Sequence, residues 1–369
     1  MLTKQLSGLT LLVLTVVIGI SAPAQRSSPT IPNLPPPVNP PPPSLYLIQD
    51  RLEAGGLRGT VVVKDGLLPW DPIPVTVSCN GKAAYTTETD AKGYFGILPS
   101  HIPGEVSQQG DSGRQMKVHF EGCVVEAFLA GFGSSTLTVT ESNLRDTPEI
   151  GTITLTREFT ARGTAMSATS KSVPASAAGH WSRAGEEMLA DRPDRARRQL
   201  EEAVRIYPGF AEAWYQLGTL LLLSNPRAAQ TCLRKAAAAD PAFVSPHEQL
   251  AGLAVQQQDW PSALASVGHY LQLDPKGTIH IWYYSALSNL QMGNIAAAEN
   301  SVNKLLAVDP LHNIRNGEQL LAVILARRAD YADALAHLRH SLSYVPEGPD
   351  AEMIRAQIAQ LERHVTKPK

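Results

Sequence analysis

Two different patterns of apolar and polar residues divide the chain into two regions. From residue 57 to about residue 157 the apolar positions recur every second residue, which is typical of half-buried strands. After residue 178 they recur every three or four residues, which predicts amphipathic helices. The chain is therefore predicted to be multi-domain, with a small antiparallel β-sandwich followed by an all-α region.

The predicted strands are rich in Val, Thr, Ile and aromatic residues, and Gly, Pro, Asp and Asn separate them. They cover residues 57–63, 73–79, 83–89, 94–98, 115–120, 123–130, 134–140 and 150–156. No helical stripe of useful length interrupts this series, so we expect one sandwich across residues 45–161. Residues 162–177 are rich in Ala, Ser and Thr without apolar periodicity, and are predicted to be a linker.

The first 24 residues have the pattern of an export signal. Lys4 supplies a positive charge, residues 9–20 form an apolar run, and Ala22-Pro23-Ala24 fits a small-x-small cleavage site before Gln25. A membrane anchor is the alternative, but about 12 apolar residues fall short of the ~20 that cross a bilayer. We therefore expect an exported protein, periplasmic or associated with the cell surface, with no membrane span after signal cleavage.

Residues 25–44 form a proline-rich segment, in which Val38 and Asn39 alone interrupt the prolines between residues 35 and 43. Proline fixes φ and has no amide donor, so this segment is predicted to be a stalk in the polyproline II conformation. The alternative is a ligand for proline-reading domains, and an exported chain favours the spacer.

Two cysteines of the predicted sandwich have the same phase as its core. Cys79 shares the parity of Val77, and Cys123 shares the parity of Val125. Both thiols therefore face the apolar side of their strands, where they could meet across the core. In an exported protein we expect a disulfide, worth about 4 kcal/mol for a loop of about 45 residues. The alternative is two separate buried thiols.

The segment Thr89-Asp90-x-x-Gly93-x-Phe95 predicts a tight turn followed by an aromatic residue that fills the core. Together with residues 59–61 and 73–77, it resembles the carboxypeptidase-regulatory-like domain, which has a prealbumin-like sandwich. The loop at residues 100–114 is longer than a hairpin needs, and departs from that pattern. The resemblance implies an accessory domain without catalytic residues. Related sandwiches can bind carbohydrate, but the sequence shows no clear aromatic platform.

The helical half of the chain contains an internal repeat of 33 to 36 residues. Each repeat has a proline, an alanine twelve residues before it, and an apolar residue four positions after that alanine. The prolines are Pro208, Pro241, Pro275, Pro310 and Pro346. The alanines are Ala196, Ala229, Ala263, Ala298 and Ala334. The apolar residues are Leu200, Leu233, Val267, Val302 and Leu338.

This pattern resembles the tetratricopeptide repeat, a pair of antiparallel helices. The aromatic-Leu-Gly positions of the first helix are clearest at Trp214, Leu217 and Gly218. A small alanine lets the helices approach closely, and the proline ends the second helix. We expect five repeats in residues 178–348, followed by a capping helix and tail in residues 349–369.

The resemblance implies a concave surface lined by the first helix of each repeat. Counting from the repeat phases places six residues there, namely Tyr215, Thr219, Glu248, Tyr283, Gln319 and Arg327. The tyrosines could hold an extended peptide by apolar contact and hydroxyl hydrogen bonds. The alternative is that they merely cover the inner face. The basic and asparagine residues of the carboxylate-clamp subclass are absent from the matching positions, so capture of a C-terminal carboxylate is not supported.

Residues capable of chemistry are few. Ser301 and Lys304 have serine-x-x-lysine spacing, but the companion motifs of that enzyme class are missing. His337 and His340 could share a metal ion, but the sequence supplies no neighbouring third ligand, which favours surface histidines. Cys232 lies on a packed helix and is predicted to be a small buried residue. We predict no catalytic residue, no cofactor and no metal site.

Net charge and composition exclude some classes of partner and of domain. The net charge is −2, so the chain lacks the excess of Lys and Arg that nucleic-acid binding requires. With only three cysteines, an array of disulfide-rich domains is excluded. The sequence therefore predicts a non-enzymatic exported scaffold that binds a protein or peptide through the concave face. The alternative is a carbohydrate-directed accessory protein whose sandwich binds glycan of the cell envelope.

Overall fold

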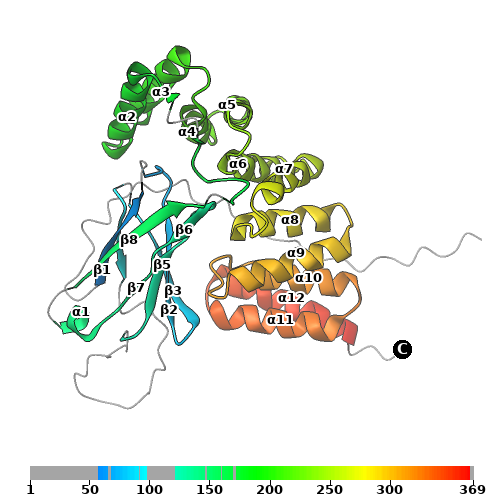
Figure 1. Cartoon of the computed structure of the whole chain (residues 1–369). Coiled ribbons are helices and arrows are strands. Elements are labelled where there is room, and N and C mark those ends of the chain that lie inside the picture. Colours follow the sequence, from blue (N-terminus) through cyan, green and yellow to red (C-terminus); the bar gives the residue numbers. More distant parts are fainter. Residues whose placement is uncertain are drawn as a thin grey trace, which may run out of the picture.

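The computed structural model describes residues 57–64, 68–90, 92–97, 121–145, 148–158, 160–168 and 172–365 (Figure 1). The predicted export signal, the stalk, the long loop and the strand at 115–120 lie outside the described residues. Two four-stranded sheets are followed by an array of helices, which confirms the predicted fold class.

The first sheet has the strand order β4-β1-β8-β6, and the second has the order β3-β2-β5-β7. The strands of the first sheet are β1 (Leu57–Val63), β4 (Tyr94–Ile97), β6 (Phe132–Ser134) and β8 (Glu149–Arg157). Those of the second are β2 (Pro74–Cys79), β3 (Lys82–Glu88), β5 (Val124–Ala127) and β7 (Leu137–Thr138). All neighbours are antiparallel except β1 and β8, which run parallel in the middle of the first sheet.

Alternate residues of the strands face a common core between the sheets. Val61 and Ile153 from the first sheet, and Val75, Val77 and Val125 from the second, are completely buried. The strand predicted at 134–140 is instead two short strands in different sheets, because the chain crosses from β6 to β7. A short helix that the sequence did not predict, α1 (Glu141–Arg145), follows.

The predicted turn before β4 is present. The Asp90 carboxylate accepts hydrogen bonds from the backbone amides of Lys92 and Tyr94, both at 2.8 Å. Gly93 has a φ of +84°, a conformation that favours glycine because it has no side chain. Phe95 then enters the core, where its ring lies against Gly59 so closely that a Cβ there would clash.

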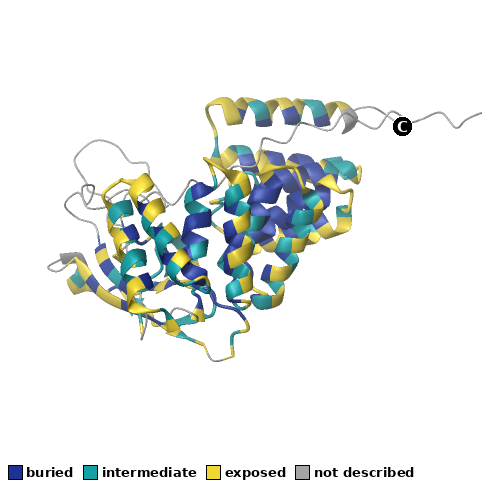
Figure 2. Cartoon of the chain, turned by 90° about the horizontal axis from the view of Figure 1, so that it is seen from above, coloured by how far each residue is buried: buried dark blue, intermediate teal, exposed yellow. Residues whose placement is uncertain are grey.

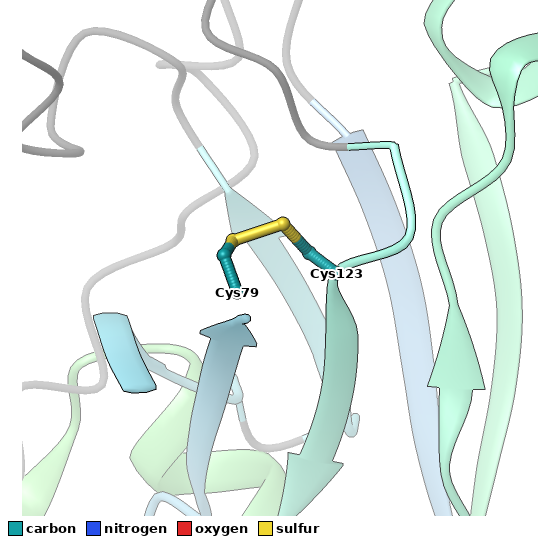
Figure 3. The surroundings of a disulfide bond; sticks show 2 residues. All are labelled: Cys79 and Cys123. Atoms are coloured by element: carbon teal, nitrogen blue, oxygen red, sulfur yellow. A yellow bond between two sulfur atoms is a disulfide. The ribbon is translucent and has the colours of Figure 1, made fainter. Parts of the chain in front are cut away.

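Cys79 and Cys123 form the predicted disulfide, but within one sheet (Figure 3). The β2–β5 register pairs Ser78 with Val124, so the two cysteines stand opposite each other one position further on. Their Cα atoms are 4.4 Å apart. Side-by-side cysteines on antiparallel strands reach this distance without crossing a core. The prediction of the pair is confirmed, and the expected path across the core is wrong.

The helices form five antiparallel hairpins and a final helix. The first helices of the hairpins are α2 (Ala175–Leu189), α4 (Ala211–Leu221), α6 (Ser245–Gln256), α8 (Ile279–Gln291) and α10 (Gly317–Arg327). The second helices are α3 (Pro193–Ile206), α5 (Pro226–Ala239), α7 (Trp260–Leu273), α9 (Ile295–Val308) and α11 (Tyr331–Tyr344). The last is α12 (Pro349–Val365). None of these described helices is long and apolar enough to cross a bilayer.

The repeat residues have the roles that the sequence predicts. Each repeated proline lies two residues after the end of a second helix. All five repeated alanines are fully buried, and Gly218 leaves no room for a Cβ beside Leu233. Buried residues form three clusters along the array, one in the first two hairpins, a small one between the second and third hairpins, and one from the third hairpin to α12 (Figure 2). Ala351 and Ile354 of α12 bury one side of that helix against the last hairpin, as a capping helix should.

Removal of the disulfide is expected to destabilise the sandwich. The bond closes a loop with a sequence separation of 44, so the Cys79→Ala/Cys123→Ala variant should lose about 4 kcal/mol of unfolding free energy. Urea-dependent hydrogen exchange in β2 and β5 measures this loss. Dithiothreitol should lower the unfolding free energy of the wild type to that of the variant, and should leave the unfolding free energy of the variant unchanged. Equal stability of variant and wild type would contradict the assigned role.

Candidate functional site: the surfaces of the helical repeats

Two tryptophans of the first helices each contact the preceding loop and the second helix of their own hairpin. The Trp214 indole N–H donates to the Pro208 carbonyl at 2.8 Å, and the Lys235 ammonium lies 4.1 Å from its ring centre. Trp282 repeats this arrangement, because its N–H donates to the Lys276 carbonyl at 2.8 Å and Lys304 lies 4.3 Å from its ring centre. Such cation–π contacts join the first and second helices of one hairpin.

The predicted groove residues are mostly inside the protein. Tyr215, Tyr283 and Gln319 are 3%, 4% and 2% exposed, respectively. Every residue at 281–290 of α8 and at 317–325 of α10 is buried, because the first helices also pack on one another. The inner helices therefore form a core in this part of the array, rather than the open face expected from the sequence.

The other three groove residues are partly buried and bond within the chain. The Thr219 hydroxyl donates to the Tyr215 carbonyl at 3.1 Å. Glu248 accepts from His280 at 3.1 Å, and Arg327 donates to the Leu290 carbonyl at 2.9 Å. Binding of a partner by these six residues stays a prediction, and the buried three offer no contact surface in this conformation.

The segment predicted to be a linker is bound along the repeats. The Ser167 backbone amide donates to a Glu212 carboxylate oxygen at 2.6 Å, and its hydroxyl donates to Asp240 at 2.6 Å. Further along, the Ser245 hydroxyl donates to the Ala165 carbonyl at 3.0 Å. Glu212 lies in the first turn of α4, Ser245 begins α6, and Asp240 directly follows α5. Residues 163–168 therefore tie the sandwich to the second and third hairpins, at the turns that join one hairpin to the next.

A loop of the sandwich docks on the first two hairpins. Trp70 stacks on Trp181 of α2 with ring centres 5.0 Å apart, and it covers Gly185 one turn later. The neighbouring Asp71 accepts a hydrogen bond from the Tyr215 hydroxyl. Tyr215 is thus occupied by the chain's own sandwich. The sequence contains no signal for this contact, because Trp70 and Asp71 lie between predicted strands.

Acidic groups accumulate at this junction. Burial, with smaller contributions from the nearby Asp71 and Asp240, raises the pKa of Glu212 to about 8, against the opposing effect of the Ser167 amide. Burial also raises the pKa of Asp71 to about 6, against the hydrogen bond from Tyr215. Desolvation disfavours the charged form of a carboxylate. The docked junction therefore binds protons more tightly than the separated parts would.

The opposite edge of the array exposes apolar side chains. Leu189, Leu223 and Met292 are 41%, 70% and 46% exposed. Leu223 and Met292 lie at equivalent positions of the turns within hairpins two and four, and Leu189 ends α2, directly before the corresponding position in hairpin one. We call this set the apolar turn row. It lies at the ends of the hairpins away from residues 163–168.

The candidate nucleophiles are held apart from any base. The Ser301 hydroxyl donates to the Ala297 carbonyl at 2.8 Å and lies 2.9 Å from the Ser285 hydroxyl. Lys304 points to Trp282 instead. Burial raises the pKa of the Cys232 thiol, which keeps it in the unreactive thiol form.

The histidines of α11 share a carboxylate. The Nδ1 atoms of His337 and His340 lie 2.6 and 3.0 Å from the two carboxylate oxygens of Glu318, which is buried at the start of α10. Helical spacing places the two histidines on one face, but it does not show which residue of another helix they meet. Sequence reasoning therefore missed Glu318.

One hollow borders this region. It has a volume of about 200 Å³ and lies among α9, α10 and α11, lined by Glu299, Asn303, Leu325, Asp333 and His337, among others. Pockets for organic ligands usually measure about 300–1,000 Å³. The hollow is therefore a poor site for a substrate-sized molecule.

Comparison with known proteins concerns the helical region. Residues 177–220 match the tetratricopeptide repeat family. No curated protein sequence matches the chain. Among solved structures, the chain is similar to MamA 41-end from Desulfovibrio magneticus RS-1, with 18% identity, a TM-score of 0.43, and 46% of this chain and 96% of that chain covered.

Two further structures have a comparable likeness. A tetratricopeptide repeat protein from Parabacteroides merdae ATCC 43184 has 17% identity and a TM-score of 0.44, with 53% of this chain and 81% of that chain covered. YrrB, described as a TPR protein with an unusual peptide-binding site, has 16% identity and a TM-score of 0.44, with coverage of 51% and 96%.

The junction carboxylates predict a pH-dependent stability. The pKa of Glu212 is about 8 in the folded protein, above its ordinary value of 4.5, so the folded state binds more protons than the unfolded state between these values. Stability should therefore fall as the pH rises from 5 to 8, by on the order of 3 kcal/mol from this group.

The Glu212→Gln variant keeps an oxygen that accepts from the Ser167 amide but cannot ionise. Urea unfolding at pH 5 and pH 8 should show a smaller loss of stability in the variant than in the wild type. Identical pH dependence of the two proteins would show that Glu212 is not buried at a docked junction.

Proposed function

We propose that this protein is an exported, non-enzymatic scaffold that binds a protein partner through its helical repeats. The observation that carries the proposal is the apolar turn row, Leu189, Leu223 and Met292. Burying such side chains against a partner is favourable, at roughly 25 cal/mol for each Å² of apolar surface removed from water. Exposed apolar surface can mark an interaction site, and the row offers one such side chain from each of three hairpins.

The spacing of the row favours a macromolecular partner. Its members belong to hairpins one, two and four, so a ligand that touches all three extends along the array. A small molecule cannot do this, whereas a helix or an extended segment of a protein can. In hairpins three and five the equivalent turns carry the exposed polar residues Gln257 and Arg328, so Gln257 interrupts the row and Arg328 borders it at one end.

The sandwich serves in this proposal as a fixed support. Its docking through Trp70 and residues 163–168 occupies one side of the array and leaves the turn row uncovered by described residues. Two observations support export. The first 24 residues have the pattern of a signal, and the Cys79–Cys123 disulfide suits an oxidising compartment.

The glycan-binding alternative has less support from the sandwich. Its exposed aromatic residues in the described part are Tyr94, which begins β4 of the first sheet, and Phe128, which follows β5 of the second. Two rings on different sheets do not form one stacking surface for a sugar. Glycan binding therefore stays a prediction from the sequence.

The test is a comparison of matched surface variants of the full chain. Leu189→Glu/Leu223→Glu places charges in the turn row at side chains that are 41% and 70% exposed, and an unchanged melting curve verifies the fold. Cross-linking and pull-down from the native envelope should recover a defined partner with the wild type, and recovery should fall at least about tenfold with the variant. Val308→Glu is the control, because Val308 is similarly exposed at the end of α9, on the opposite edge.

Equal recovery of the partner by the wild type and by the turn-row variant would show that the partner does not bind through the apolar turn row. Loss of recovery with Val308→Glu alone would place the contact on the edge that also carries residues 163–168.

A further inference from the structure

Three side chains from separate elements converge beside the last hairpin. His312 lies in the loop between α9 and α10, Glu318 lies in the first turn of α10, and His340 lies on α11. One ligand atom from each, two imidazole nitrogens and a carboxylate oxygen, lie within 4.8 Å of one another. Two histidines and a glutamate form a ligand set that zinc accepts in proteins.

The distances are close to those of a metal site. His340 Nδ1 is 3.0 Å and His312 Nδ1 is 4.0 Å from the same oxygen of Glu318. Ligand atoms around a tetrahedral zinc ion, with bonds of about 2.0–2.2 Å, are roughly 3.3 Å apart. Small rotations of the side chains would therefore place all three atoms around one ion.

His312 has an unused nitrogen at this place. Its Nδ1 is buried and has no hydrogen-bond partner. A buried polar atom without a partner raises the free energy of the folded state, because it has lost its hydrogen bonds to water and has formed none within the protein. A Glu318 oxygen lies 4.0 Å from this nitrogen, which is too far for a hydrogen bond and suitable for a shared cation.

The backbone holds His312 in a fixed position. Its φ is +52°, a conformation that residues with side chains seldom adopt. The buried Asp309 carboxylate secures this turn by accepting from the backbone amides of Asn313 and Ile314, at 2.9 and 2.8 Å. Backbone strain that is kept in place by its surroundings is common at functional sites.

Neighbouring side chains orient the three groups. His337 Nδ1 donates to the second oxygen of Glu318 at 2.6 Å. The Tyr344 hydroxyl lies 2.6 Å from His340 Nε2, and its ring stacks on His312 at 4.3 Å. If His340 binds through Nδ1, its Nε2 carries the proton and donates to the tyrosine oxygen. Ligand histidines usually have such a partner on the other nitrogen.

We propose that His312, Glu318 and His340 form a binding site for one zinc ion, with His337 and Tyr344 as positioning residues. The His340 side chain is 50% exposed, which gives the ion a path from solvent and leaves a fourth position open to water. Mixed nitrogen and oxygen ligands favour zinc-class ions over calcium and magnesium, which prefer oxygen alone. The ion would connect the α9–α10 loop, α10 and α11.

The test uses the untagged, metal-free full chain and zinc chloride. Calorimetric titration should give one ion per chain, and zinc should raise the melting temperature, since an ion that binds only the folded state stabilises it. His340→Gln should weaken binding at least about 100-fold, and His337→Gln about 10–100-fold. Calcium and magnesium should have no effect.

The control is His269→Gln. His247 and His269 stack at 5.4 Å on α6 and α7, away from Glu318, so this variant should bind zinc as the wild type does. His340 is half exposed, so its replacement leaves the fold intact, which a melting curve without zinc verifies. Absence of stoichiometric binding, unchanged affinity in His340→Gln, or an equal loss in His269→Gln would overturn the proposal.

Discussion

Close contact between helices at five buried alanines is the constraint on which the array depends. At Ala196 and its four equivalents the side chain has no exposed surface, so a larger residue would separate the paired helices. The apolar residue four positions later is buried as well, and Leu233 packs against Gly218 of its own hairpin. The same tight stacking buries α8 and α10, and it therefore removes the open inner face that a looser array would have.

Local features of the fold could be predicted from the sequence because neighbouring residues determine them. Asp90 and Gly93 form their turn through hydrogen bonds that span at most four residues. The repeated prolines end helices for reasons internal to each repeat. The cysteine pair could be predicted from parity and from the expected export, but its place within one sheet depends on the pairing of β2 with β5, which strand patterns do not reveal.

The surfaces could not be predicted because contacts between distant residues determine them. Tyr215 occupies a position that the repeat pattern assigns to a groove, yet Asp71, 144 residues earlier, bonds to its hydroxyl. Residues 163–168 have the composition of a spacer, and carboxylates 45 and 73 residues from Ser167 hold them. Glu318 meets His337 and His340 only because α10 and α11 pack with that face between them.

The attachment of residues 163–168 determines how mechanical load passes through the molecule. This segment precedes the first hairpin in the chain, but its hydrogen bonds run to Glu212, Asp240 and Ser245 of the second and third hairpins. A pull on the sandwich is therefore transmitted into the middle of the array through these hydrogen bonds, and into α2 through the stacking of Trp70 on Trp181. The load is thus divided between the first hairpin, which is attached by a stacking contact, and the second and third hairpins, which are attached by hydrogen bonds.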